Sequence, residues 1–430
     1  MACDHHIETL CLHAGYEGDP TTMACGVPVY RTSSYHFKDT THAADLFALK
    51  QLGNIYTRIM NPTQDVLEKR VAALEGGAAA LALASGTSAI YYTIINICRQ
   101  GDEIVSSSHL YGGTYTMFDC ILPQFGITTR FVDPTNPQNF AAAITQRTKL
   151  IFIETIGNPK LFVPDFNAIA DIAHSRGLPL VVDSTFTTPA LFRPIEHGAD
   201  IVCHSLTKWM GGHGTGIGGV VVDAGRFDWT NPNFPLFNEP DPSYHGLRYA
   251  HDLGDLNPVA FIMRMRLVPL RNLGACISPD NAWMFLQGLE TLPLRMERHC
   301  QNAQAVADYL SEQPLVSWVS YPGLAGDPAH ANASKYFRNG YGGMVVFGIC
   351  GGREEGARFI NALELFSHLA NVGDAKSLAI HPASTTHSQL DQAQQIAAGV
   401  DPGLIRLSIG IEHIDDILRD INRGLEAAVK

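Results

Sequence analysis

The stretch that decides the fold reads Ala199-Asp200-Ile201-Val202-Cys203-His204-Ser205-Leu206-Thr207-Lys208-Trp209-Met210-Gly211-Gly212. An apolar run of strand length ends in two hydroxyl residues, a single lysine and a pair of glycines. A lysine amine at the end of a strand can bond the aldehyde of a cofactor whose phosphate accepts hydrogen bonds from Ser205 and Thr207. The alternative is a solvated lysine beside a glycine turn, so other parts of the sequence must decide between the two.

Four further apolar runs of strand length precede this stretch, and each ends in polar or small residues. They cover residues 80–84, 103–106, 150–154 and 178–182. Helical patterns over 86–99 and 166–176 lie between some of them. This alternation predicts an α/β fold with a mostly parallel central sheet that is covered on both faces. Parallel sheets bind ligands beyond the carboxyl ends of their strands, so the residues after each run form the candidate site.

The residues at those strand ends have types that suit one ligand. Ser85-Gly86-Thr87 begins a predicted helix, whose free backbone N–H groups can hold a phosphate. Tyr111 offers a ring for stacking, and Asn158 offers an amide. Asp183 follows an apolar strand directly, where a carboxylate needs a cation such as a protonated pyridine nitrogen. Together with Lys208, these types match pyridoxal phosphate.

Each of these residues also has an ordinary structural interpretation. Ser85 can cap a helix, Tyr111 can pack in a loop, Asn158 can form a turn and Asp183 can cap the turn that follows it. Because all of them fall at the same edge of one predicted sheet, a shared binding site is the better explanation.

The second half of the chain predicts a smaller C-terminal α+β domain. Ser278 and Pro279 begin a long amphipathic helix that is expected to run toward Tyr309, with a kink near Pro293. Strands are expected at 316–320, 344–349 and 404–409, and helices at 354–366 and 414–428. The Pro-rich stretch 227–257 is long for a connection and is expected to be a functional or interfacial loop.

Composition excludes several classes of function. The 430 residues are 46% hydrophobic and 17% charged, which is typical of a folded protein of two or three domains. The net charge of -12 and the lack of a basic block argue against nucleic acid. Nine scattered cysteines without a C-x-x-C pair indicate reduced thiols and a cytoplasmic protein. We expect no membrane span or secretion signal, and no metal, because His5, His6 and His13 lack partners at ligand spacing.

Several segments match one known family in order and approximate spacing. They are Tyr56-Thr57-Arg58-Ile59-Met60-Asn61-Pro62-Thr63, Ser85-Gly86-Thr87-Ser88-Ala89 and the runs that end in Asp183 and Lys208. Through them, essentially the whole chain resembles the Cys/Met-metabolism family of pyridoxal-phosphate enzymes. The resemblance implies the fold type I of PLP-dependent transferases, which is aspartate-aminotransferase-like. We expect an N-terminal arm (1–62), a PLP-binding α/β domain (63–265) and a C-terminal α+β domain (266–430).

The resemblance also implies roles for residues around the cofactor. Lys208 would bond the cofactor aldehyde, Asp183 would contact the pyridine nitrogen, Tyr111 would stack on the ring and Asn158 would lie near the ring oxygen. Of these, Lys208, Asp183 and Tyr111 are the implied catalytic residues.

Other residues are implied at the two ends of the site. The phosphate would be held by Gly86, Thr87, Ser205 and Thr207, and by Tyr56 and Arg58 reaching in from a neighbouring subunit. Arg406 would take the substrate α-carboxylate through two hydrogen bonds, with Asn371 and Tyr56 nearby.

Within the family, segments 239–247, 286–292 and 371–378 are most similar to the O-acetylhomoserine sulfhydrylase branch. That branch implies a γ-replacement in methionine biosynthesis, in which O-acetyl-L-homoserine and sulfide give L-homocysteine and acetate. It also implies a homotetramer, built as a dimer of dimers with shared active sites. Gly113, where methionine γ-lyases have cysteine, and Asn371, where many relatives have serine, both weigh against a lyase.

Other activities stay open at this stage. Methionine γ-lyase, O-succinylhomoserine sulfhydrylase and cystathionine γ-synthase differ in pocket shape, which the sequence does not reveal. A dinucleotide-binding oxidoreductase is suggested by the glycines of 214–219, but that run follows a loop and leads into a strand, the wrong context for the motif. A non-catalytic binding protein would have lost site residues, and none of the expected ones is missing.

Overall fold

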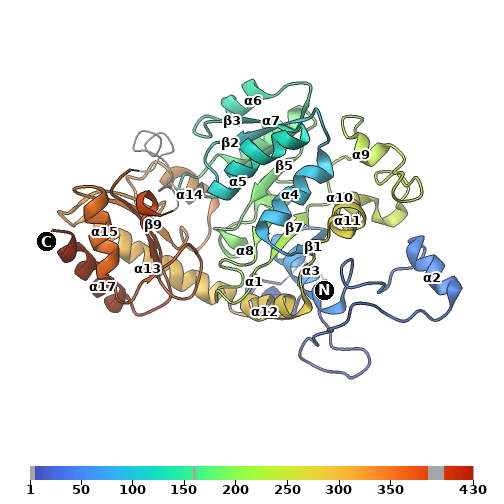
Figure 1. The fold of residues 1–430 in the computed structure, drawn as a ribbon, viewed down its shortest axis with the longest axis horizontal. Helices are drawn as coiled ribbons and strands as arrows, with labels where there is room; N and C mark the ends of the chain where they lie inside the picture. Colours follow the sequence, from blue (N-terminus) through green and yellow to red (C-terminus); the bar gives the residue numbers. More distant parts are fainter. Residues whose placement is uncertain (1–4, 158–160, 386–400, 430) are drawn as a thin grey trace.

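The computed structural model describes residues 5–157, 161–385 and 401–429. In this part of the chain, a large α/β unit surrounds a seven-stranded sheet, and a smaller unit surrounds a five-stranded sheet. Helices α12 (Pro279–Glu290) and α13 (Leu292–Ser311) run from the larger unit to the smaller one (Figure 1). The predicted architecture, a mostly parallel central sheet with a smaller C-terminal α+β unit, is confirmed.

The large sheet has the strand order β1-β7-β6-β5-β4-β2-β3. Its strands are β1 (Ala79–Leu83), β2 (Glu103–Ser107), β3 (Thr128–Val132), β4 (Thr148–Glu154), β5 (Leu180–Asp183), β6 (Ile201–Ser205) and β7 (Gly219–Asp223). Strands β3, β2, β4, β5 and β6 pair in parallel, whereas β7 is antiparallel to both of its neighbours. The sequence patterns missed β3, because this partly exposed edge strand carries threonines and Arg130 rather than an apolar run.

Alternating strand residues enter two separate cores. On one face, Val182 and Val202 pack with helices α3 (Pro62–Glu75) and α7 (Phe166–Ser175). On the other, Val181 and Ile201 pack with α4 (Gly86–Ile97) and α10 (Ala260–Met265). This burial on both faces explains why the strands read as continuous apolar runs.

The stretch 227–257 belongs to the second of these cores. Trp229, Phe234, Phe237 and Tyr249 are buried there, and the ring of Trp229 stacks on Phe237 with centroids 4.3 Å apart. The stretch contains the short helix α9 (Pro235–Asn238). Its aromatic residues therefore help to build the large unit.

The predicted long helix from Ser278 is in fact two helices. Ser278 caps α12, since its Oγ accepts a hydrogen bond from the Asn281 N–H at 3.1 Å. The helix is interrupted at Thr291. Pro293 occupies the second position of α13, where the N–H that proline lacks would have no partner within the helix. The expectation of one kinked helix is corrected accordingly.

The smaller sheet has the order β10-β11-β12-β9-β8. Its strands are β8 (Val316–Ser320), β9 (Met344–Ile349), β10 (Ser367–His368), β11 (Leu378–Ile380) and β12 (Leu404–Ser408). Helix α15 (Arg353–Ala362) ends before the expected residue 366, because the Asp420 carboxylate of α17 (Ile414–Ala428) takes the N–H groups of residues 364–366. Strands β10 and β11 are too short to leave a sequence signal.

Shorter elements complete the described chain. The helices are α1 (Ile7–His13), α2 (Thr40–Phe47), α5 (Gly112–Thr116), α6 (Gln138–Ala143), α8 (Thr188–Leu191), α11 (Arg271–Leu273) and α14 (His330–Tyr336). Short 3₁₀ turns lie at Leu122–Phe125, Pro194–His197, Gly254–Val259 and Pro382–Ser384, and π segments at Met117–Ile121 and Arg266–Leu270. Within the described ranges, no helix has the length and apolar character of a membrane span.

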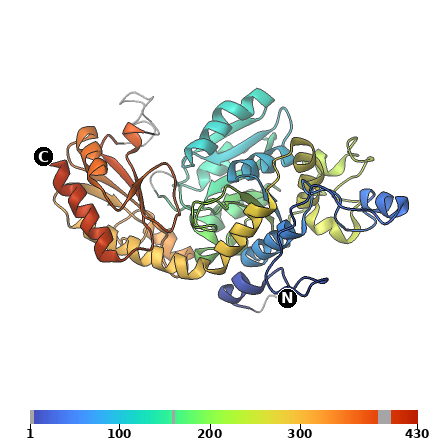
Figure 2. The same ribbon diagram turned by 60° about the horizontal axis from the view of Figure 1, so that its bottom comes forward.

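The part of the N-terminal segment around α2 stands apart from both sheets, whereas Leu10 and Cys11 of α1 are buried in the first core. In two views 60° apart, α2 lies at the periphery of the molecule, away from the strands (Figures 1 and 2). Its carboxyl end is held by Tyr244, whose hydroxyl donates to the Phe47 carbonyl at 2.8 Å. The α2 part of the arm is therefore fixed to the body at the stretch 227–257.

Candidate active site

A cavity of about 270 Å³ opens at the carboxyl ends of β4, β5 and β6. Most of its walls come from the large unit, and residues 370–372 and Arg406 of the smaller unit close one side. The lining residues are Ser85, Gly86, Thr87, Ile90, Tyr111, Thr114, Glu154, Thr155, Ile156, Asp183, Thr185, Phe186, Ser205, Thr207, Lys208, Ile217, Ala370, Asn371, Val372 and Arg406. The cavity therefore lies where a parallel sheet is expected to bind its ligand.

Lys208 projects into this cavity from the turn that follows β6. Its Nζ donates a hydrogen bond to Asn371 Oδ1 at 2.5 Å. Burial and the nearby Arg406 charge lower the pKa of Lys208 to about 8. A larger share of this amine is neutral near pH 7 than in an ordinary lysine, as bonding to an aldehyde requires.

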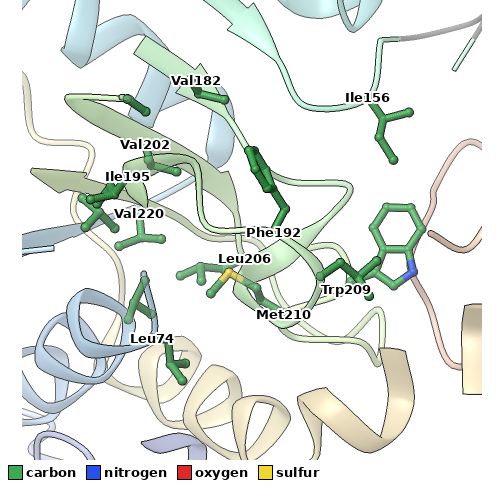
Figure 3. Packing of buried hydrophobic residues seen from close by; sticks show 14 of the residues in the cluster. Leu74, Ile156, Val182, Phe192, Ile195, Val202, Leu206, Trp209, Met210 and Val220 are labelled. Carbon is green, nitrogen blue, oxygen red and sulfur yellow. The ribbon is translucent and has the colours of Figure 1, made fainter. Parts of the chain in front are cut away.

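The turn that carries Lys208 is held in place by a buried arginine of α13. Arg295 of α13 donates to the carbonyls of Trp209 at 2.6 Å, Met210 at 3.2 Å and Gly288 at 2.6 Å. Trp209 and Met210 are buried in the same apolar core as Leu206 (Figure 3). The lysine backbone is therefore fixed while its amine faces the cavity.

Asp183 is the last residue of β5. It accepts hydrogen bonds from the Thr185 N–H at 3.0 Å and the Thr185 hydroxyl at 2.5 Å. The same hydroxyl accepts from the Ser205 N–H at 2.9 Å, which ties Asp183 to β6. Burial raises the pKa of Asp183, so the carboxylate gains from a cation beside it. A protonated pyridine nitrogen would provide such a cation.

The beginning of α4 suits an anion. The first N–H groups of a helix have no partner within it, and Gly86 and Thr87 contribute them to the cavity. A Cβ at Gly86 would lie 2.6 Å from the Ser205 Cβ, so glycine is required for this close approach. The Ser205 hydroxyl faces the same space, whereas the Thr207 hydroxyl also accepts the Gly218 N–H at 3.1 Å. These groups fit a phosphate.

Tyr111 directly precedes α5, and this residue is 54% exposed, at the cavity. The ring lies against Gly113, where an added Cβ would come 2.5 Å from the ring Cε1. The Tyr111 N–H donates to Glu154 Oε1 at 2.7 Å. Burial and the Asp183 charge raise the pKa of Glu154 well above its usual range.

Arg406 interrupts the otherwise buried strand β12 and faces the cavity. Burial lowers the pKa of its guanidinium. Within the described ranges it has no salt bridge, so this cation is available to a carboxylate ligand.

Most of the implied site residues meet in this cavity. They are Gly86, Thr87, Tyr111, Asp183, Ser205, Thr207, Lys208, Asn371 and Arg406. Tyr56 and Arg58 lie outside it, with the Arg58 guanidinium 5.3 Å from the centre of the Tyr56 ring. Asn158 falls outside the described residues. No three His, Cys, Asp or Glu side chains of the described ranges form a metal-binding group.

Sequence reasoning missed three contributors. Thr185 supports Asp183, Glu154 holds the Tyr111 loop and Arg295 anchors the lysine turn. Only Thr185 left a signal, since a hydroxyl two residues after an aspartate commonly bonds to it in a turn.

Known proteins share both the sequence and the fold of this chain. O-acetyl-L-homoserine sulfhydrylase of Leptospira meyeri is 56% identical over 97% of this chain and 96% of its own length. Homocysteine synthase of Schizosaccharomyces pombe is 54% identical over 98% of this chain and 99% of its own.

A solved structure agrees with these relatives. The putative O-acetylhomoserine (thiol)-lyase of Campylobacter jejuni superposes with a TM-score of 0.94 at 41% identity, covering 98% of this chain and 100% of that one. That structure contains N'-pyridoxyl-lysine-5'-monophosphate. The cavity described above has the lysine, the partly buried aspartate and the anion-binding helix start that such a group needs.

The sequence model of one family matches residues 8–426. The chain therefore belongs to the Cys/Met metabolism PLP-dependent enzymes.

Proposed function

We propose that this enzyme converts O-acetyl-L-homoserine and sulfide to L-homocysteine and acetate, a step of methionine biosynthesis. The observation that carries the proposal is a cavity with one reactive amine, Lys208, and one guanidinium without a salt bridge, Arg406. These groups suit an amino acid that bears a single carboxylate. The named relatives catalyse, by their names, the formation of homocysteine or the sulfhydrylation of the acetyl ester.

The charges of the cavity favour the acetyl over the succinyl ester. A succinyl group carries a second carboxylate, which needs a cation when it leaves water. Among the described lining residues, Lys208 and Arg406 are the cationic side chains, and both have other roles in this proposal. An acetyl group needs only apolar contacts such as Ile217 or Val372 offer.

Four residues of the cavity take part in the reaction itself. Arg406 binds the substrate α-carboxylate, with Asn371 beside it and Tyr56 reaching in from a neighbouring subunit. Lys208 would bond the cofactor aldehyde and, once released from it, would take the proton from Cα as a neutral base. When bound, pyridoxal phosphate supplies an electron sink that stabilises negative charge at Cα. Asp183 keeps a positive charge on the ring nitrogen, and Tyr111 stacks on the ring.

The remaining residues hold the cofactor. Gly86, Thr87, Ser205 and Thr207 would bind its phosphate, and by the family resemblance Asn158 would serve its ring oxygen. A proton would also leave Cβ before the C–O bond to acetate at Cγ breaks and a C–S bond to sulfide forms there. Protons would then return to Cβ and Cα, so that acetate is exchanged for sulfide and L-homocysteine is complete.

Gly113 supports replacement over elimination. Its missing side chain lets the Tyr111 ring lie close over the backbone, whereas a cysteine there would push the ring outward. A lyase-like cavity would therefore need a different tyrosine position. Methionine γ-lyase activity is the alternative, and α-ketobutyrate would reveal it.

The proposal includes assembly and location. Residues 1–62 form an arm, 63–265 the PLP-binding domain and 266–430 the C-terminal domain. Tyr56 and Arg58 lie outside the cavity of their own chain, and this position supports our proposal that they serve the phosphate of a neighbouring subunit. The enzyme is a cytoplasmic homotetramer, a dimer of dimers with shared sites.

The test is sulfide-dependent homocysteine formation by the cofactor-loaded protein, with acetyl and succinyl esters of L-homoserine supplied in parallel. Homocysteine from the acetyl ester is the expected result. A preference for the succinyl ester, or α-ketobutyrate without homocysteine, would refute the proposal.

A further inference from the structure

A buried and a partly buried carboxyl group lie side by side at the edge of the sheet. Glu154 ends β4 and Asp183 ends β5, and the two residues are direct partners in the parallel pairing of these strands. Both line the cavity, and Glu154 is only 8% exposed. Two neighbouring carboxyl groups cannot both ionise without cost, particularly where water is scarce.

Asp183 accepts more hydrogen bonds than Glu154. Asp183 accepts two from Thr185, whereas Glu154 accepts one, from the Tyr111 N–H. Hydrogen bonds to an ionised carboxylate stabilise it, so Asp183 is the better placed of the two to carry the charge. The other oxygen of Glu154 has no hydrogen bond with a described residue.

The cationic side chains of the cavity do not make Glu154 a better site for the negative charge than Asp183. Lys208 donates to Asn371, and Arg406 forms no salt bridge with Glu154. A cation that pairs with Asp183 would reduce the repulsion that Asp183 exerts on Glu154. It would leave the burial of Glu154 unchanged, and burial is the main reason that the pKa of this carboxyl group is raised.

We propose that Glu154 is a positioning residue: as a neutral carboxylic acid it holds the Tyr111 loop at the cavity, and it leaves Asp183 as the carboxylate that pairs with a cation. The bond acts at the backbone of Tyr111, so it sets the position of the ring indirectly. The inference concerns the cofactor site and holds whichever acyl ester the enzyme uses.

The protonation state is tested by infrared difference spectroscopy of the holoenzyme at neutral pH. Subtracting Glu154→Gln from the wild type should show loss of a protonated carboxyl band. The matched control is Glu103→Gln, another strand glutamate, which hydrogen bonds from Arg130 hold at a pKa of about 2. That difference should show loss of ionised carboxylate bands. A carboxylate signal from Glu154 would overturn the proposal.

The positioning role is tested by a second comparison. Glu154→Ala should lower kcat/KM about tenfold, as expected for one lost hydrogen bond, and should change the circular dichroism of the cofactor band. Glu154→Gln should restore most of both, because its amide oxygen can accept the same N–H. An alanine variant like the wild type, or a glutamine variant as poor as alanine, would refute it. The infrared readout needs no turnover, so a wrong substrate assignment would leave it unaffected.

Discussion

Lys208 and Asn371 are 163 positions apart in the sequence and are joined by a 2.5 Å hydrogen bond from Nζ to Oδ1. The bond holds the amine of the large unit against a loop of the smaller one. The geometry of the base therefore depends on both units.

Removing the amide should release the lysine amine. Asn371→Ala is expected to lower kcat/KM by about 10-fold or more, since a hydrogen bond to a charged group stabilises by about 1.5–3 kcal/mol. Asn371→Ser keeps an acceptor and should lose less. Steady-state kinetics of the two variants measures the difference, and equal losses would show that the contact with Lys208 is unimportant.

Cofactor capture should follow the titration of Lys208. Since its pKa is lowered to about 8, the neutral amine forms as pH rises through that value rather than near 10.5. Reloading the apoprotein with pyridoxal phosphate should therefore accelerate with pH and level off above about 8. Stopped-flow absorbance measures the rate.

The same shift predicts the sign of a stability change. A lysine whose pKa is lowered on folding holds fewer protons in the folded chain, so stability rises with pH between about 8 and 10.5. Lys208→Met should lack this rise in urea titrations of the apoprotein. A rise of equal size in the variant would assign it to other groups.

Arg406 should act mainly through substrate binding. Arg406→Gln removes the charge and is expected to raise KM about 10-fold or more. Arg406→Lys keeps the charge but cannot form two parallel hydrogen bonds, so its KM should lie between the values of the wild type and Arg406→Gln. Initial rates over a range of acyl ester concentrations separate KM from kcat, and an unchanged KM would contradict the assignment.

Arg295 should support both stability and cofactor retention. Arg295→Met removes the bonds to the Trp209, Met210 and Gly288 carbonyls, and we expect a loss of about 2–4 kcal/mol in the free energy of unfolding. Arg298→Met, an exposed position on the same helix, is the matched control. Urea unfolding and the rate of cofactor loss on dilution report the two effects. Equal behaviour of the two variants would refute the role of Arg295.

Mixed assemblies test whether Arg58 acts across a subunit boundary. Lys208→Ala and Arg58→Ala should each be nearly inactive alone. When the two chains are co-expressed, a mixed dimer has one site with both native residues, so activity should recover to about one quarter of the wild type. Recovery would be absent if Arg58 served its own chain.

The parts of the site that the sequence revealed are those that end apolar strands. The runs before Asp183 and Lys208 are buried on both faces, so their patterns are unbroken and their ends are clear. The capping role of Ser85 could be predicted equally well, because a serine directly before a helix commonly caps it. Here its hydroxyl accepts a hydrogen bond from the Ser88 N–H.

The contacts of the site that could not be predicted from the sequence are bonds between a side chain and the main chain. Arg295 bonds carbonyl groups, which every residue has, so no residue type in the sequence marks its targets. The Glu154 bond to the Tyr111 N–H is hidden for this reason too.

The cavity draws its walls from Ser85 to Arg406, a span that includes most of the chain. During synthesis, a nascent chain that has emerged only to β7 contains Lys208 but not the anchor Arg295, the amide of Asn371 or the guanidinium of Arg406. Domains generally fold as they leave the ribosome, and here the reactive lysine precedes its partners by many residues. Assembly of the complete cavity is thus a late event that reports on the folding of both units.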